Sequence, residues 1–347
     1  MPADEDFLLK EDEATRAPTE PRGFAPGQMV RCEECLRANP PVRTNCLYCA
    51  AALPMTEQSA ALLKPTLRPL EKWERGFNSI FIPGRVENLN ADNLEAVASL
   101  LRMTNEEARR IAEAKEPLPI ARVATEAEAV LIERRLEELG LRVLTIADEV
   151  LALESSPPRR IRSLELTDDA LVACPPGSSE RLLASWDNIT LLVKGRVVVR
   201  QVEVEERRGR REENEIVETR ELSADDALLD IYASTQNGNW RIVAGNFDFS
   251  CLGEKKSLVS AQNFAVLLAQ LRARANHAEY DESYARVRHA LNTIWPLEQQ
   301  TESRGWRRGG PGRYSTEMVT TSDNERQFTR YSRLRYYLRT QRTDADS

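Results

Sequence analysis

The sequence predicts a multidomain α+β protein in which a small cysteine-rich module precedes two larger domains. Three observations predict it: two C-x-x-C pairs near the N-terminus, alternating helical and strand periodicity over residues 77–150, and a run of strand-like segments over residues 160–276. A chain of 347 residues is long enough for two or three domains. We expect an acidic, disordered tail over residues 1–28 and linkers over residues 54–76 and 151–159.

The bulk composition is that of a globular protein, with 41% hydrophobic and 30% charged residues. No stretch approaches the ~20 consecutive apolar residues of a membrane span, and the acidic N-terminus lacks the residue order of a signal peptide. We therefore expect a cytoplasmic protein with no membrane span, in which cysteines stay reduced and favour metal binding over disulfides. The net charge of −7 argues against a general nucleic-acid binder.

Four cysteines carry the most specific chemistry in the chain. They form two C-x-x-C pairs, in R-C-E-E-C-L and N-C-L-Y-C-A, with ten residues between the pairs: Cys32, Cys35, Cys46 and Cys49. Each pair can place two thiolates on one tight turn, and two such turns can close a tetrahedron around a structural Zn²⁺ ion. Iron in a rubredoxin-like site would use the same ligands, and the spacing does not separate the two metals.

With this spacing the module, residues 29–53, resembles a short zinc ribbon. It is too short to bury enough apolar surface to fold alone, so the metal would supply its stability. Four thiolates leave no open coordination position, which implies a structural site and not a catalytic one. A redox dithiol is the less favoured alternative, because a reactive pair normally lies on a thioredoxin-like βα turn.

Local signals predict a β-α-α-β-α-β order in the second domain. Asn90 caps the first predicted helix, and Thr104 opens a capping box with Glu107 before the second. Thr125 caps the third helix, and Gly140 ends it. The expected strands are residues 77–82, 118–123 and 141–146.

Within this domain, T-N-E-E-A-R-R-I-A and T-E-A-E-A-V-L-I-E-R-R-L-E-E-L-G-L-R-V resemble the C-terminal domain of the bacterial ribosomal stalk protein, and through that fold the Clp protease adaptor. Residues 136–143 fit the end of the family's last helix well. The resemblance covers about a fifth of the chain. It implies the α+β fold of that family and a habit of binding other proteins or peptides.

Beyond residue 160 the sequence changes to strands separated by turn signals. Lys194-Gly195 and Asn237-Gly238 read as turns, and the charged residues 207–214 read as a protruding loop. Ser260 caps a closing helix with apolar residues on one face. The expected strands are residues 161–166, 170–174, 189–193, 196–205, 216–222, 228–234 and 240–251.

This region, residues 160–276, resembles a bacterial pleckstrin-homology-like domain through D-D-A-L-V-A and S-W-D-N-I-T-L-L-V-K-G-R-V, in which Trp186 opens a strand. The resemblance implies a seven-stranded barrel or sandwich closed by a helix. Eukaryotic relatives bind phosphoinositides through basic loops. The corresponding loops here carry Asp168, Asp169 and Glu180, so lipid binding is not expected.

The C-terminal part of the chain is rich in arginine and aromatic residues. Residues 277–297 predict a further helix. Residues 298–347 predict a basic, aromatic and largely disordered tail that ends in a short amphipathic helix. Its Gly309-Gly310-Pro311-Gly312 run reads as a flexible hinge, because no strand precedes it and no lysine-serine pair follows.

No P-loop, nucleophile elbow or dinucleotide fingerprint accompanies these modules, so we expect no enzyme activity. Cys174 and Cys251 are expected as small buried hydrophobes in strands, and His277 and His289 as surface residues. The hypothesis is a non-catalytic, cytosolic zinc-binding adaptor or scaffold that mediates protein–protein interaction. The alternative is a regulator associated with RNA or DNA, in which the zinc ribbon and the arginine-rich tail contact phosphates. The sequence specifies neither the partner nor the oligomeric state.

Overall fold

A computed structural model of the chain describes most of the sequence beyond the N-terminal tail. The described residues are 24–43, 45–54, 67, 70–71, 74–84, 90–151, 158–208, 214–234, 239–310 and 313–345. Most of the expected N-terminal tail, and much of both expected linkers, lie outside them. The chain divides into two compact units, Met1–Lys64 and Pro65–Ser347, which are described separately. No described helix combines the length and the apolarity needed to cross a membrane.

The first unit contains very little regular structure in its described part. A short 3₁₀ helix, Pro26–Gln28, precedes strands β1 (Val30–Arg31) and β2 (Ala38–Asn39), which pair antiparallel. An isolated bridge joins Asn45 to Ala52. Among the described residues of this unit, four hydrophobic residues are buried together, and two of them are cysteines: Val30, Cys32, Cys46 and Leu53. Such a core is too small to hold the unit together without further linkage.

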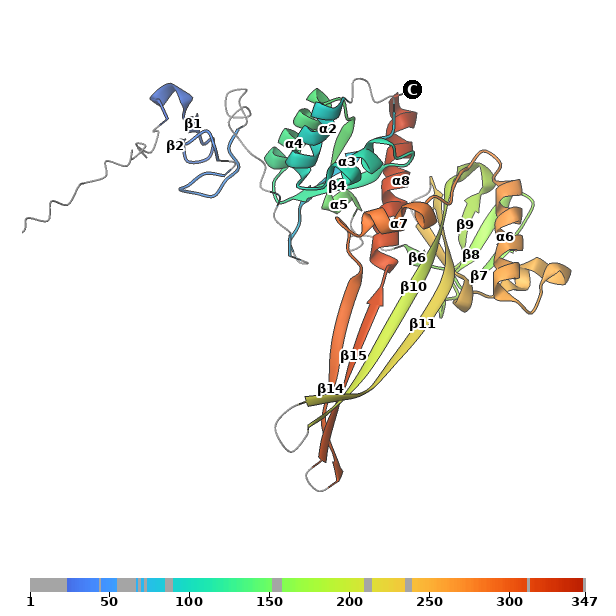
Figure 1. The fold of residues 1–347 in the computed structure, drawn as a ribbon. Coiled ribbons are helices and arrows are strands. Elements are labelled where there is room, and N and C mark those ends of the chain that lie inside the picture. The colour runs from blue at the N-terminus through green and yellow to red at the C-terminus, as the bar shows by residue number, and fades with distance from the viewer. Residues whose placement is uncertain are drawn as a thin grey trace, which may run out of the picture. The chain divides into compact units, whose positions relative to one another are not determined.

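The second unit begins with the β-α-α-β-α-β order that the sequence predicts. The caps at Asn90, Thr104 and Thr125 are all present, and Gly140 has the positive φ of 90° that a left-handed cap requires. The three strands pair antiparallel in the order β4-β3-β5 (Figure 1). The elements are β3 (Phe77–Phe81), α2 (Ala91–Leu101), α3 (Asn105–Ala112), β4 (Leu118–Val123), α4 (Glu126–Glu138) and β5 (Val143–Ala147), followed by α5 (Asp148–Leu151).

The next segment forms two sheets in place of one seven-stranded barrel. Strands β7 (Ser163–Leu166), β8 (Ala170–Cys174) and β9 (Leu182–Ser185) make an antiparallel three-stranded sheet, of which β9 was not expected. A second, curled sheet has the order β14-β15-β10-β11-β12-β6, with β13 parallel to β10. Three of its seven strands come from beyond residue 276: β13 (Glu279–Asp281), β14 (Glu298–Gly310) and β15 (Arg313–Asp323).

Two strands of this sheet are much longer than the sequence suggested. β10 (Ile189–Arg208) runs through the expected turn at Lys194-Gly195, and β11 (Asn214–Ala233) joins two expected strands into one. Gly195 is needed for packing and not for a turn, because a Cβ atom there would lie 2.2 Å from the Phe328 ring. The glycine therefore allows a helix to approach the strand closely.

The strand expected over residues 240–251 is also wrong in its second half. β12 (Asn239–Val243) is short, and the chain then enters two 3₁₀ helices, Ala244–Asn246 and Phe249–Lys255. The two-residue β6 (Arg159–Arg160) lies parallel to β12. Helix α6 (Ser260–Arg274) packs into the core that β7 to β12 enclose, as a closing helix should.

The segment over residues 298–347 is not a largely disordered tail. β14 and β15 form a hairpin, and β15 pairs with the outer half of β10 from Val199 to Arg208. We call these two strands, with the outer halves of β10 and β11, the four-stranded ribbon; it extends past the rest of the second unit (Figure 1). The chain then forms α8 (Glu325–Ala345), far longer than the expected short amphipathic helix. The helix expected over residues 277–297 shrinks to α7 (Tyr284–Leu291), which follows β13.

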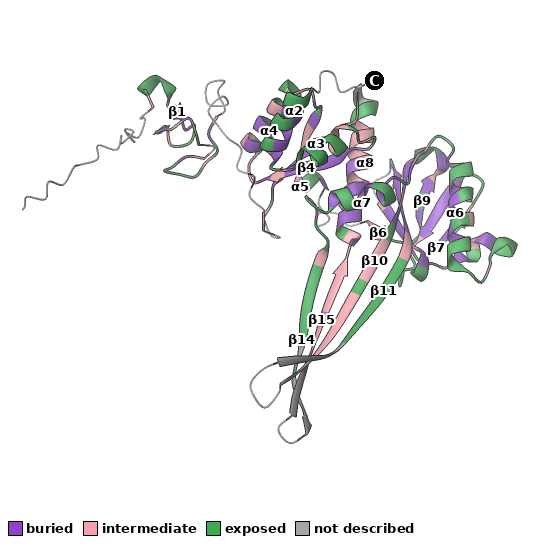
Figure 2. Cartoon of the chain, viewed as in Figure 1, coloured by how far each residue is buried: buried purple, intermediate pink, exposed green. Residues whose placement is uncertain are grey.

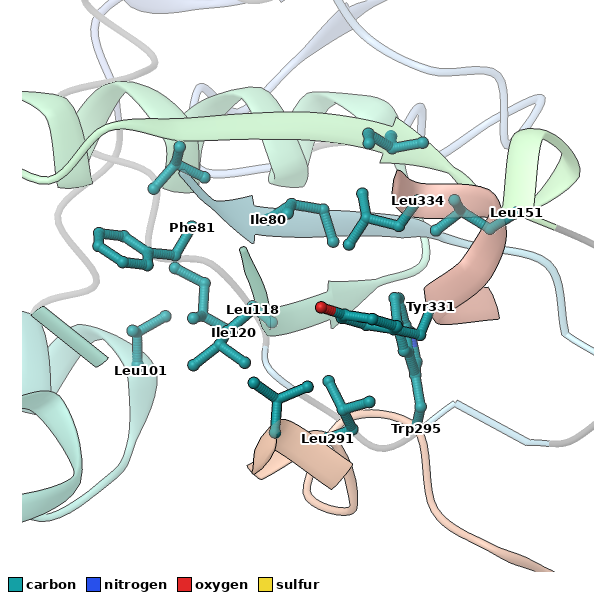
Figure 3. Packing of buried hydrophobic residues seen from close by; sticks show 14 of the residues in the cluster. Ile80, Phe81, Leu101, Leu118, Ile120, Leu151, Leu291, Trp295, Tyr331 and Leu334 are labelled. Atoms are coloured by element: carbon teal, nitrogen blue, oxygen red, sulfur yellow. The ribbon is translucent and has the colours of Figure 1, made fainter. Parts of the chain in front are cut away.

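Helix α8 is ordered because it completes a core. Phe328, Tyr331 and Leu334 are fully buried, and they share one hydrophobic cluster with Ile80 and Leu151 (Figures 2 and 3). Arg335 on the same helix forms ion pairs with Glu116, Glu279 and Asp281. The core that begins at β3 therefore does not end at residue 150, but extends through β10, α7 and α8.

Candidate metal centre

The two C-x-x-C pairs lie on turns with the same hydrogen bonds. In the first turn, the Leu36 N–H donates to the Cys32 carbonyl at 2.9 Å, and the Cys32 N–H donates to the Arg37 carbonyl at 2.9 Å. In the second turn, the Ala50 N–H donates to the Cys46 carbonyl at 3.0 Å, and the Cys46 N–H donates to the Ala51 carbonyl at 2.8 Å. Each turn is thus closed on both sides by backbone, which directs its two sulfur atoms to one point.

Both turns end in the same unusual backbone conformation. Leu36 and Ala50 directly follow the second cysteine of their pairs, and each has a φ of 60°. This left-handed region favours glycine and costs an L-residue roughly 1–2 kcal/mol. The module therefore holds two strained positions that its very small core does not explain.

The four sulfur atoms converge at the spacing of a tetrahedral metal site. All four Sγ atoms lie within 4.8 Å of one another, with 3.6 Å between Cys32 and Cys49 and 3.5 Å between Cys35 and Cys46. Four ligands at about 2.3 Å from a tetrahedral metal would lie about 3.8 Å apart. The separations are far beyond the ~2.05 Å of a disulfide bond. The residues that the sequence singled out are therefore together, and they could hold a metal ion.

Asn39 supports this cluster from the end of β2, and the sequence analysis missed it. Its side chain is fully buried, and its Nδ2 atom donates to the Arg37 carbonyl at 2.9 Å and to Cys46 Sγ at 3.5 Å. Its Oδ1 atom accepts the Leu47 N–H at 2.8 Å. One side chain thus joins both turns. In the sequence, nothing but its place between the two cysteine pairs distinguishes Asn39.

The sulfur atoms differ in their readiness to lose a proton. Burial acts to raise the pKa of Cys46, but hydrogen bonds from the N–H groups of Tyr48 and Cys49, and then from Cys35 and Asn39, lower it to about 6. The Ala51 N–H acts to lower the pKa of Cys49, but burial and the neighbouring thiols outweigh it and raise the pKa to about 12. Cys46 therefore loses its proton more readily than Cys49 when no ion is bound, whereas a bound cation would favour the thiolate form of its ligands.

The other sequence-selected residues do not join this cluster. Cys174 ends β8 and Cys251 lies in a 3₁₀ helix, so the second was misplaced, and both are half-buried and not fully buried. His277 and His289 are exposed, as expected. Gly309 and Gly310 end strand β14, and the rest of the expected hinge lies outside the described residues.

Comparison with known proteins adds no family to this picture. No family model matches the chain, and no curated protein or solved structure shows significant similarity to it. The geometry of the cysteine module and of the second unit therefore carries the functional argument.

Proposed function

We propose that this protein is a non-catalytic zinc-binding adaptor that contacts other proteins through its cysteine module. The observation that carries the proposal is a set of large apolar side chains left exposed around the two turns. Leu36 is 63% exposed, Leu47 53% and Tyr48 56%. A module with so few buried apolar residues would gain stability by burying these three, so their exposure supports a role in binding.

The surroundings of Tyr48 support a prepared binding surface. The Arg37 guanidinium lies over the Tyr48 ring, 4.7 Å from its centroid, which restricts the ring and places a cation beside it. Tyrosine, arginine and leucine next to one another resemble the centre of a protein interface more than an ordinary solvated surface. Val42 is exposed on the same small module and enlarges its apolar surface.

The chemistry of the cysteine cluster supports zinc and a structural role. Four sulfur ligands suit Zn²⁺, and a site filled by four protein thiolates has no position left for a substrate. Zinc would also supply the linkage that the small core lacks, and would offset the strain at Leu36 and Ala50. The metal-bound module would then hold its exposed side chains in fixed positions.

The two sequence resemblances support the same proposal for the second unit. The elements from β3 to β5 have the order that resemblance to the ribosomal stalk protein domain implies, and that family binds proteins or peptides. Strands β7 to β12 followed by α6 are compatible with the pleckstrin-homology-like reading, although the curled sheet takes further strands from the C-terminal part. Both resemblances are thus to families of interaction domains.

Pairing of the C-terminal arginines favours a protein partner over nucleic acid. Arg335 and Arg339 form ion pairs with Glu279, and Arg326 pairs with Glu298. Cations paired in this way neutralise fewer phosphates. The arginines of β14 and β15, Arg304, Arg307, Arg308 and Arg313, have side chains outside the described part of the structure, and the RNA or DNA alternative now depends on them.

The test is affinity purification of the full chain from its native host with quantitative mass spectrometry. We expect a defined set of proteins to be lost from a Leu47→Ser/Tyr48→Ser variant, because it removes apolar contact area but no metal ligand. The matched control is Leu258→Ser, which changes a fully exposed leucine on the second unit. Zinc content measured on all three proteins confirms that the module is loaded.

Two results would contradict the proposal. One is recovery of the same proteins with the double variant as with the wild type. The other is retention of the chain on heparin or labelled RNA that falls steeply as salt rises, which would favour the nucleic-acid alternative.

A further inference from the structure

A cavity of about 480 Å³ lies in the second unit between the α+β segment and helix α8. Leu101 at the end of α2 and Ile120 on β4 form part of its apolar wall, together with Trp295, which Figure 3 shows in the same core. Ile294 and Leu297 continue the wall along the segment that follows α7. Its size and its apolar lining are those of a small-molecule site, for which ≈ 300–1,000 Å³ is usual.

Arginine side chains also line the cavity, and they differ in how they are paired. Arg122 forms a close ion pair with Asp148 and donates to the Glu74 carbonyl at 2.7 Å. Arg326 pairs with Glu298 at 2.7 Å, and Arg102 donates to the Leu67 carbonyl at 3.4 Å. Arg330, one helical turn after Arg326, is half-buried and has neither a hydrogen bond nor an ion pair with any described residue.

The unpaired, half-buried guanidinium of Arg330 reduces the stability of the fold. Burial lowers the pKa of Arg330, and although Asp148 and Glu298 attract it from a distance, Arg122 and Arg326 repel it. Both carboxylates are already engaged by those two arginines. A charged group that is withdrawn from water without a partner destabilises the fold, and an anion in the cavity would remove that cost.

The wall beside Arg330 is held in place by satisfied hydrogen bonds. Gln327 donates to Asn292 and to the Trp295 carbonyl, both at 2.7 Å, and accepts from Tyr284 at 2.9 Å. The Trp295 Nε1–H donates to the Asn78 side chain at 2.9 Å. These hydrogen bonds fix the wall, and among the described residues that line the cavity Arg330 is the charged group with neither a hydrogen bond nor an ion pair.

We propose that this cavity binds a small carboxylic acid with an apolar body, whose carboxylate pairs with Arg330. A single unpaired guanidinium balances one negative charge and matches a carboxylate through two parallel hydrogen bonds. The apolar body lies against Leu101, Ile120 and Trp295. This ligand site is separate from the cysteine module and goes beyond the adaptor function proposed above.

The test is isothermal titration calorimetry of the full-length, zinc-loaded chain with decanoate. We expect saturable one-to-one binding, with much weaker binding of decanol and of decyltrimethylammonium, which lack the negative charge. Decyl phosphate serves as a further arm, since its doubly charged head group carries more charge than Arg330 alone balances. Decyl phosphate binding more tightly than decanoate would overturn the assignment to carboxylic acids.

Arg330→Met separates the site from a merely structural arginine. We expect it to weaken decanoate binding at least tenfold, and to raise or leave unchanged the melting temperature, because a desolvated charge is removed. Arg342→Met is the matched control, because it removes an exposed arginine of the same helix that does not line the cavity, and it should leave decanoate affinity unchanged. Arg330→Lys should restore part of the affinity. Equal decanoate affinity in wild type and Arg330→Met, or no binding of decanoate at millimolar concentration, would overturn the proposal.

Discussion

At the residue scale, the backbone strain of the cysteine module lies at Leu36 and Ala50. Each sits in the left-handed backbone region directly after a C-x-x-C pair. Both side chains are exposed, so replacing them removes no buried contact. Their conformation is imposed by the turn that presents the sulfur atoms, and the strain is part of the metal site.

Glycine at either position should strengthen metal binding. Leu36→Gly or Ala50→Gly relieves roughly 1–2 kcal/mol of backbone strain, and glycine loses roughly 0.5–1 kcal/mol through its greater freedom in the unfolded chain. We expect each variant to bind zinc a few-fold more tightly, measured by competition with a chelator. Ala51→Gly is the control, because Ala51 does not have a positive φ; a gain there equal to that of Ala50→Gly would contradict the argument.

Asn39 is the second decisive residue of the module. Asn39→Ala removes both donors to Arg37 and Cys46 and the acceptor for the Leu47 N–H. We expect zinc affinity to fall by roughly 10–100-fold, as for other groups that orient metal ligands. The same chelator competition measures it. An unchanged affinity would mean that the cysteine turns hold their positions without the asparagine.

At the element scale, the close contact between β10 and α8 rests on one glycine. In Gly195→Ala, the added Cβ would overlap the Phe328 ring, and Phe328 is fully buried and has little room to move. Overpacking of this kind typically costs about 1–3 kcal/mol. We expect a corresponding fall in the free energy of unfolding, measured by chemical denaturation.

The control for this substitution is Gly84→Ala. Gly84 lies in the same unit, but a Cβ atom there meets nothing within 4 Å, and it has no positive φ. Its effect on stability should therefore be small. If both glycine substitutions cost the same, then the contact between Gly195 and Phe328 is not what makes the first one destabilising.

The elements that the sequence predicted are those whose signals are local. Caps at Asn90, Thr104 and Thr125 mark helix starts within a few residues, so the order from β3 to β5 could be predicted. Gly195 was read as a turn because its reason, Phe328, lies far along the chain. Helix α8 was expected only as a short amphipathic helix in a basic, aromatic tail, because its partners are equally remote.

The candidate metal site, too, could be predicted from the sequence only where its signals are local. Four cysteines at fixed spacing are a local pattern, and the structure brings their sulfur atoms together. Asn39 escaped notice because nothing nearby in the sequence marks an amide that will be fully buried. Arg330 escaped too, since its lack of a partner is apparent only when the distant Asp148 and Glu298 are placed.

At the scale of the whole molecule, the two compact units should depend differently on the metal. Cys46→Ser removes one ligand from a module whose hydrophobic cluster itself contains Cys46, so we expect loss of stoichiometric zinc and local unfolding. The second unit has its own large cores and should keep its melting temperature. Elemental analysis and thermal unfolding followed by circular dichroism measure the two effects.

Cys174→Ser is the matched control for this prediction. Cys174 is a half-buried cysteine of the second unit, outside the sulfur cluster, and its serine variant should retain zinc. A metal content that drops equally in both variants would point to a general loss of folding. A second unit that melts earlier in Cys46→Ser would show that the units stabilise each other.

The place of α8 in the core also bears on how the protein is made. A ribosome delivers residues in order, so Ile80 and its neighbours emerge long before Phe328, Tyr331 and Leu334, which cover them. During that interval the nascent chain carries an unfinished apolar surface that it cannot bury. Growing chains in this state are prone to aggregate and are bound by chaperones. The core around Ile80 therefore stays open to solvent until residues 328–334 have left the ribosome.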